Sequence, residues 1–294
     1  MSLDPRLADE LGALAPLEDL TAVVRQAAAA ILAMDPTQTH ARVKSDRTPV
    51  CNADLVAQSA LIEGLARLMP ALPIVSEEAG APPQTRRPHD SFALIDPLDG
   101  TREFLAGRPE FTVNLAIVIG GVPAIGIVAA PALEGLWRGI VGRGAEFLPG
   151  NGEDSAGPAA GRVPITTRPR PAAGLTVAVS RSHFDEATAR FLSHIPLAGR
   201  IVAGSSLKFC RLAEGQADLY PRLAPVCEWD VAAGHAILTA AGGTVVTPEG
   251  GGVPYGRAND EFRLHGFIAC GDATIMPEMM DAVRLSRQGL RPHS

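Results

Sequence analysis

The segment DPLDGT, at residues 96–101, places two carboxylates and a hydroxyl within six residues. The carboxylates belong to Asp96 and Asp99, and the hydroxyl belongs to Thr101. Hard divalent cations prefer oxygen ligands, so the Leu98 carbonyl is a further candidate ligand. A helix that begins here would also attract a phosphate group through its backbone N–H groups and its dipole. The alternative at this point is an ordinary capped turn with solvated acids.

The local pattern predicts a strand, a turn and a short helix. The apolar run at residues 92–95 is typical of a buried strand. Pro97 biases Asp96 toward extended backbone, so we expect the strand to end there with Asp96 pointing outward. The Asp-Gly pair at 99–100 indicates a turn, and Thr101 is expected to cap the helix that follows.

Two other segments place acids at the ends of predicted elements. Residues 73–78 form a short apolar strand that ends in Glu77 and Glu78. Asp230 comes directly before a run of small and apolar residues, where we expect it to cap a helix. Each segment alone is a weak indication, because acids at such positions are usually solvated. Together, four carboxylates at the ends of three elements predict a metal site.

These segments, SEE at 76–78, DPLDGT at 96–101 and WDVAAG at 229–234, carry a family resemblance. The sequence resembles the magnesium-dependent, lithium-sensitive phosphatases that include inositol monophosphatase and fructose-1,6-bisphosphatase. Within them it is most similar to the bacterial 3'(2'),5'-bisphosphate nucleotidases. The supporting segments lie between Arg42 and Cys270, at residues 44–50, 102–114, 180–183, 204–210 and 218–223. The resemblance implies an α/β fold, a layered α-β-α-β-α sandwich.

The resemblance also implies roles for the acidic residues. It places one Mg2+ on Glu77, Asp96 and the Leu98 carbonyl, and a second on Asp96, Asp99 and Asp230. Thr101 would orient the attacking water, Asp46 would accept its proton, and Glu77 would assist. The substrate would contact ten residues: Glu77, Leu98, Asp99, Gly100, Thr101, His183, Ser205, Lys208, Arg222 and Asp230.

The two lysines of the chain, Lys44 and Lys208, both lie in segments that match the nucleotidase pattern. A codon bias toward arginine would also explain why lysine is rare. By resemblance, Lys208 acts as a point charge on the substrate and Arg222 binds a 5'-phosphate through two N–H groups. Lys208 facing solvent and His183 as an ordinary loop histidine are the alternatives.

The resemblance implies that the chain hydrolyses the 3'-phosphate of adenosine 3',5'-bisphosphate, with 3'-phosphoadenylyl sulfate as a further substrate. An inositol or sugar monophosphatase on the same metal site is the alternative enzyme, and it would not need Lys208 and Arg222. A regulatory binding module without activity is a third reading. Such a module should lack a metal carboxylate, whereas all four are present here.

Composition narrows the class of protein. The chain has 294 residues, 46% hydrophobic and 20% charged, which is typical of a globular protein. Its net charge of −6 argues against nucleic acid as a partner. The four cysteines are scattered and no segment resembles a signal peptide or a membrane span, which predicts a cytoplasmic protein. Association with the inner face of the cell membrane and the oligomeric state stay open.

The elements that must position the site follow from hydrophobic periodicity. Apolar residues at helical spacing predict helices over 17–32 and 52–68, and apolar runs predict strands over 111–119, 122–130, 136–140 and 145–148. A loop at 149–161 precedes alternating strands and helices from Leu175 onward. We therefore expect an α+β domain at 1–160 with most metal ligands. An α/β domain at 161–294 would carry the WD motif and the substrate-binding residues.

Overall fold

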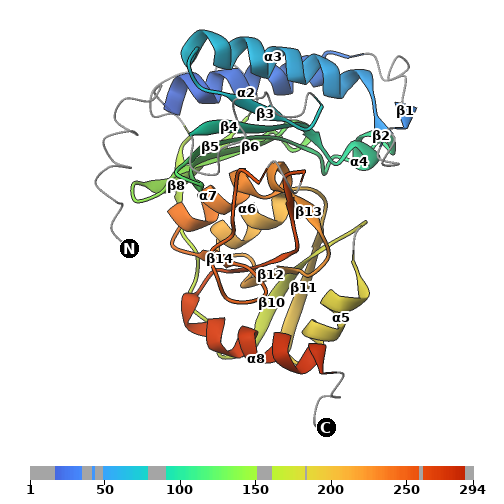
Figure 1. Cartoon of the computed structure of the whole chain (residues 1–294), viewed down its shortest axis with the longest axis vertical. Coiled ribbons are helices and arrows are strands. Elements are labelled where there is room, and N and C mark those ends of the chain that lie inside the picture. The colour runs from blue at the N-terminus through green and yellow to red at the C-terminus, as the bar shows by residue number, and fades with distance from the viewer. Residues whose placement is uncertain are drawn as a thin grey trace.

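A computed structural model of the chain describes residues 17–34, 42–43, 49–78, 91–150, 161–182, 184–257 and 261–288. Figure 1 shows five layers, helix, sheet, helix, sheet and helix, which confirms the predicted sandwich. The outer layer at the top consists of α2 (Leu17–Leu32) and α3 (Asn52–Leu68), with the predicted bounds. The opposite outer layer contains α5 (Glu186–Leu192) and α8 (Met276–Arg287).

The first sheet has seven strands in the order β3-β4-β5-β6-β7-β8-β9. Its neighbours are antiparallel except for the parallel pair β3 and β4. The strands are β3 (Ile74–Ser76), β4 (Phe92–Asp99), β5 (Thr112–Ile119), β6 (Val122–Ala130), β7 (Gly135–Ile140), β8 (Gly144–Pro149) and β9 (Val163–Ile165). The sequence did not predict β9, because three residues that include a proline give no periodic signal.

The second sheet has five strands in the order β11-β10-β12-β16-β14, and it mixes parallel and antiparallel pairs. The strands are β10 (Leu175–Ser180), β11 (Leu197–Ala203), β12 (Leu219–Arg222), β14 (Thr244–Val246) and β16 (Phe267–Cys270). Two short ribbons pair β1 (Arg42–Val43) with β2 (Pro49–Val50), and β13 (Val226–Cys227) with β15 (Arg263–Leu264).

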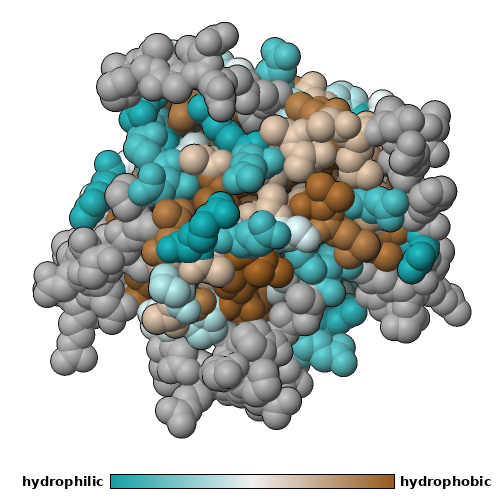
Figure 2. Space-filling model, turned by 90° about the horizontal axis from the view of Figure 1, so that it is seen from above, coloured by the Kyte–Doolittle hydropathy of each residue, from teal (hydrophilic) through white to brown (hydrophobic). Residues whose placement is uncertain are grey.

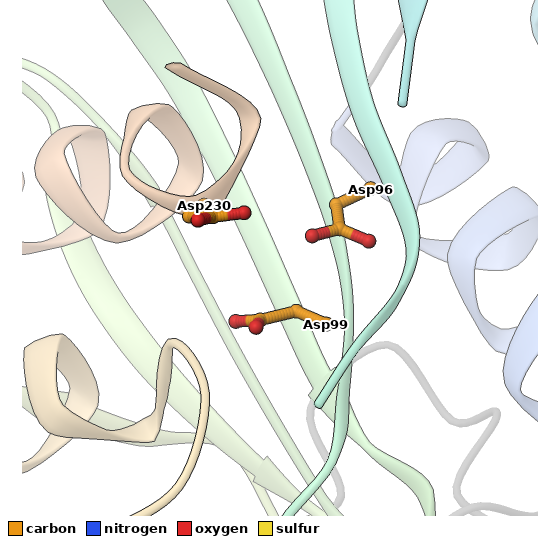
Figure 3. Close-up of side chains that lie close together, drawn as sticks. All are labelled: Asp96, Asp99 and Asp230. Atoms are coloured by element: carbon orange, nitrogen blue, oxygen red, sulfur yellow. The ribbon is translucent and has the colours of Figure 1, made fainter. Parts of the chain in front are cut away.

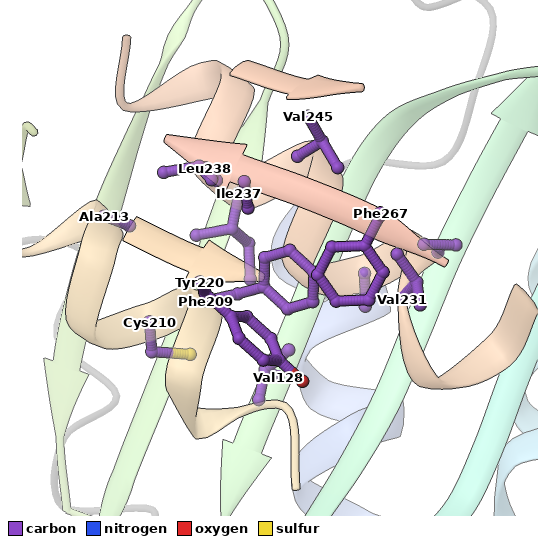
Figure 4. Packing of buried hydrophobic residues seen from close by; sticks show 14 of the residues in the cluster. Val128, Phe209, Cys210, Ala213, Tyr220, Val231, Ile237, Leu238, Val245 and Phe267 are labelled. Atoms are coloured by element: carbon purple, nitrogen blue, oxygen red, sulfur yellow. The ribbon is translucent and has the colours of Figure 1, made fainter. Parts of the chain in front are cut away.

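Helices α6 (Leu207–Ala213) and α7 (Ala232–Ala240) lie between the two sheets. Helix α7 packs directly on β6, where a Cβ added to Gly126 would lie 2.1 Å from the Ala233 carbonyl oxygen. Beside it, the rings of Phe209, Tyr220 and Phe267 pack with centroids 4.9–5.2 Å apart (Figure 4). The close contact between Gly126 and Ala233 fixes the start of α7 relative to the first sheet.

The outer helix α2 is tied to the first sheet by a buried arginine. The Arg138 side chain on β7 is fully buried and pairs with Glu18 at 2.8 Å and with Glu146 at 2.6 Å. Figure 2 looks onto this layer, where hydrophilic and hydrophobic residues are interspersed. In the described part of the chain, no helix combines the length and hydropathy that crossing a membrane requires.

Candidate active site

The strand β4 carries both aspartates of the DPLDGT segment. The strand continues to Asp99 instead of ending at Asp96, with a register shift between partners Asn114 and Thr112 on β5. Pro97 has no N–H to donate to a neighbouring strand, and the Leu98 N–H donates to the Asp96 Oδ1 at 3.1 Å. This irregularity lets two side chains three positions apart face the same space. The prediction that Asp96 points outward from a strand end is therefore wrong, because its side chain is buried.

The third aspartate, Asp230, belongs to the half of the molecule that contains the second sheet. Asp230 ends a short 3-10 helix, η5 (Glu228–Asp230), and Val231 is the N-cap of α7. Because Val231 and not Asp230 is the N-cap residue, the prediction that Asp230 caps the helix is wrong. Its backbone carbonyl accepts a hydrogen bond from Ser206 Oγ at 3.0 Å, and the same hydroxyl lies 3.0 Å from Asp99 Oδ2.

Asp96, Asp99 and Asp230 form a carboxylate cluster that could hold a cation. Their ligand oxygens lie within 4.8 Å of one another, and the three side chains face a common space (Figure 3). Burial, followed by the charge of Asp99, raises the pKa of Asp230 to about 7. Burial and the charge of Glu77 raise the pKa of Asp96 above its usual range.

The cluster fits a hard divalent cation. Within the described residues, the buried Asp96 Oδ2 has no hydrogen-bond partner. Such an orphaned carboxylate oxygen is costly without a ligand, and the donor set is all oxygen, as Mg2+ prefers. Glu77, directly after β3, and the Leu98 carbonyl border the same pocket, and both stay predicted ligands.

Thr101 is positioned by a residue that the sequence analysis missed. Its hydroxyl lies 3.2 Å from the Leu98 carbonyl oxygen and 3.2 Å from Asp54 Oδ1. Thr101 is the first residue of α4 (Thr101–Leu105), whereas Gly100, with φ of 93°, is the N-cap, so the prediction that Thr101 caps the helix is wrong. The left-handed φ favours glycine at this position.

Asp54 lies in the first turn of α3 and is 1% exposed. Its second carboxylate oxygen accepts a hydrogen bond from the Cys51 N–H at 2.8 Å, which is one half of a capping box. Burial is the main reason why the pKa of Asp54 is raised, and the charge of Glu77 adds to it. An acid at the third position of a predicted helix was the only signal in the sequence. Asp46, to which the sequence analysis gave the role of proton acceptor, lies outside the described residues.

The predicted substrate residues Ser205, Lys208 and Arg222 line the same pocket, which has a volume of about 420 Å³. Lys208 is 2% exposed, so the alternative in which it faces solvent is wrong. Its Nζ donates to the carbonyls of Ser205 at 2.5 Å and Ala203 at 3.3 Å, and burial lowers its pKa to about 8.

Most of the predicted site residues therefore line one pocket. Its lining includes Glu77, Asp96, Leu98, Asp99, Gly100, Thr101, Ser205, Lys208, Arg222 and Asp230. Among the described residues, the buried Ser205 Oγ and Arg222 Nε have no hydrogen-bond partner. His183 and Lys44 lie outside the described part of the chain.

Residues 15–278 match the Inositol monophosphatase family. The 3'(2'),5'-bisphosphate nucleotidase CysQ of Salmonella typhimurium is 38% identical over 224 residues, which cover 76% of this chain and 86% of that protein. The protein of the same description from Buchnera aphidicola is 35% identical over 256 residues, covering 86% of this chain and 92% of that protein.

Two solved structures have the same fold. CysQ from Bacteroides thetaiotaomicron superposes with a TM-score of 0.73 at 30% identity, covering 86% of this chain and 95% of that chain. An IMPase from Thermotoga maritima superposes with a TM-score of 0.72 at 23% identity, over 91% of this chain and 96% of that chain. The chain whose pocket gathers these carboxylates belongs to the inositol monophosphatase family.

Proposed function

We propose that the chain is a phosphomonoester hydrolase that removes the 3'-phosphate of adenosine 3',5'-bisphosphate and also accepts 3'-phosphoadenylyl sulfate. The observation that carries this proposal is a single pocket that combines a candidate metal site with cationic side chains. The carboxylate cluster of Asp96, Asp99 and Asp230 borders the same pocket as the buried Lys208 and the partly buried Arg222. The relatives from Salmonella and Buchnera are both named 3'(2'),5'-bisphosphate nucleotidases, which supports the same substrate class.

We propose that the carboxylate cluster holds at least two Mg2+ ions, with Glu77 and the Leu98 carbonyl as additional ligands. When bound, Mg2+ lowers the pKa of a coordinated water and neutralises charge on the leaving oxygen. Without a cation, the raised pKa values of Asp96 and Asp230 show how costly this concentration of negative charge is.

The chain's own residues would handle the proton and the phosphate. Thr101 Oγ1, between Asp54 and the Leu98 carbonyl, is placed to accept a hydrogen bond from an attacking water while donating its own proton to Asp54. Asp54 would then hold the proton, which suits a carboxyl whose pKa is raised by burial. The backbone at Gly100 and Thr101 borders the pocket, where it would contact the transferred phosphate.

The second phosphate would bind where Lys208 and Arg222 reach the pocket. The buried Nε of Arg222 has no hydrogen-bond partner among the described residues, and a guanidinium binds phosphate oxygens through paired N–H groups. Ser205 and, by resemblance, His183 would contact the nucleotide beside them. The four cysteines are free, which fits a cytoplasmic location, and contact with the inner face of the membrane is part of the same proposal.

Phosphate release from adenosine 3',5'-bisphosphate, inositol 1-phosphate and fructose 1,6-bisphosphate tests the proposal, with Mg2+ and with EDTA. We expect the adenosine compound to give the largest kcat/KM and EDTA to abolish turnover. Preference for inositol 1-phosphate would support the monophosphatase alternative. Absence of turnover on all three with Mg2+ present would support the binding module and refute hydrolysis.

A further inference from the structure

The carboxylate of Glu110 joins the two halves of the molecule beside the pocket. Glu110 lies between α4 and β5, next to the first sheet. Its two oxygens accept hydrogen bonds from Arg181 Nε at 2.9 Å and Arg181 Nη2 at 3.0 Å. The same carboxylate accepts a hydrogen bond from the Gly204 N–H at 3.2 Å. Arg181 follows β10 and Gly204 follows β11, so both partners lie at the ends of strands of the second sheet.

The contact at Gly204 is too close for any other residue. A Cβ at this position would lie 2.6 Å from the Glu110 carbonyl oxygen and 3.1 Å from the Glu110 Cβ. Another hydrogen bond between the two halves joins Ser182 Oγ to the buried Glu103 carboxylate. The approach of the two halves is therefore defined by backbone contact as well as by charge.

The residue after Gly204, Ser205, has an unfavourable backbone conformation. Ser205 has φ of 41°, in the left-handed region that is unfavourable for a residue with a side chain. Such a conformation persists only where surrounding contacts hold it. The Glu110 carboxylate accepts a hydrogen bond from the N–H of Gly204, the residue before Ser205. Lys208 Nζ donates a hydrogen bond to the Ser205 carbonyl oxygen at 2.5 Å. The outcome is a buried Ser205 hydroxyl at the pocket that has no partner among the described residues.

We propose that the Glu110–Arg181 ion pair is a positioning device that orients Ser205 and Lys208 for the substrate group that binds at that end of the pocket. The inference rests on the proposed function, because it assigns these two residues to substrate binding. Glu110 acts through the backbone of Gly204 and touches no substrate itself.

The ion pair is suited to this role more than to holding the fold together. The Arg181 side chain is 40% exposed and that of Glu110 is 22% exposed. Partial burial opposes ionisation of Glu110, but Arg181 outweighs it and holds the pKa of the carboxyl below its usual range. Since partly exposed ion pairs add little to folding stability, removing this one should alter the geometry of the turn before it alters the fold.

Glu110→Gln tests the inference, because it keeps the shape of the side chain and removes its charge. We expect KM for adenosine 3',5'-bisphosphate to rise about tenfold, with kcat within about twofold and an unchanged melting temperature. Arg181→Gln should give the same result, and the double variant should be no worse than either single variant, because both remove one pair. KM for inositol 1-phosphate, which has no second phosphate, should change by less than about twofold.

Glu186→Gln is the matched control. It removes an exposed ion pair with Arg190 on α5, at 2.5 Å, and should leave both KM values unchanged. An unchanged KM for the bisphosphate in Glu110→Gln would overturn the inference. So would a loss that is equal on both substrates, or one that appears in kcat or melting temperature alone. Failure of the proposed function is recognised separately, because the wild-type protein itself would then release no phosphate from the bisphosphate.

Discussion

The carboxylate cluster should make the metal-free protein less stable, and replacing Asp230 by Asn should relieve that penalty. The pKa of Asp230 rises from 3.8 to about 7 on folding, because the carboxyl is desolvated and faces Asp99. Each unit is equivalent to about 1.4 kcal/mol, so ionising this group in the folded state costs about 4 kcal/mol at most. Asp230 lines the pocket, where contact with water reduces the penalty, so we expect Asp230→Asn to be about 1–4 kcal/mol more stable than the wild type in EDTA at pH 8.

The pH dependence has a defined sign. Protonated Asp230 imposes no penalty, so its contribution to the free energy of unfolding is fully present below pH 3.8. This contribution is lost as the pH rises through about 7, because Asp230 keeps its proton to a higher pH in the folded state than in the unfolded state. Urea unfolding in EDTA should therefore show the advantage of Asp230→Asn at pH 8 and little of it near pH 4.

Saturating Mg2+ should reverse the order of stability, because a bound ion stabilises only the wild-type protein fully. Asp281→Asn on the exposed face of α8 is the control, and it should behave as wild type. If Asp230→Asn is the less stable protein in EDTA at pH 8, the electrostatic reasoning is refuted.

Four further changes test separate parts of the structure. Asp54→Asn should lower kcat about a thousandfold, equivalent to about 4 kcal/mol, at an unchanged melting temperature; more than a tenth of wild-type activity would exclude Asp54 as proton acceptor. Lys208→Ala should cost about 1.5–3 kcal/mol in kcat/KM for adenosine 3',5'-bisphosphate and much less for inositol 1-phosphate, and equal losses would argue against a second-phosphate site. His235→Phe should reduce the loss of folding stability below pH 6.5, because burial lowers the pKa of His235 to about 4 and the unfolded state therefore takes up the proton at higher pH than the folded state. If acid unfolding curves of the variant and the wild type coincide, this reasoning is contradicted. Gly126→Ala should destabilise by about 3 kcal/mol in thermal unfolding, since the new Cβ meets the Ala233 carbonyl, and a wild-type melting temperature would show that β6 and α7 can separate at little cost.

The sequence predicted those parts of the fold that repeat a pattern. Helices 17–32 and 52–68 and strands 111–119 and 122–130 were predicted, because apolar periodicity and apolar runs are local signals. Strand β9 and the ribbon of β13 and β15 have two or three residues each, too few to show a period.

The site was predicted by residue type but not by geometry. The motifs located Asp96, Asp99 and Asp230, yet the continuation of β4 past Pro97 depends on pairing with β5. The buried state of Lys208 depends on packing against Tyr220, whose ring lies 5.2 Å from its Nζ. Asp54 was missed because its function depends on Thr101, which is 47 residues away in the chain and adjacent only after folding.

The strand orders of the two sheets have a consequence for how the protein is made. Strands β3 to β9 are neighbours in space in the order in which the ribosome releases them, so each can pair soon after it emerges. The second sheet cannot be completed in that way, because β16, at residues 267–270, must insert between β12 and β14. Asp230 depends on that late half, whereas Asp96 and Asp99 belong to the early one. A nascent chain would therefore stay inactive until nearly all of it has been synthesised, and the first half could fold without exposing a working phosphatase to the cell.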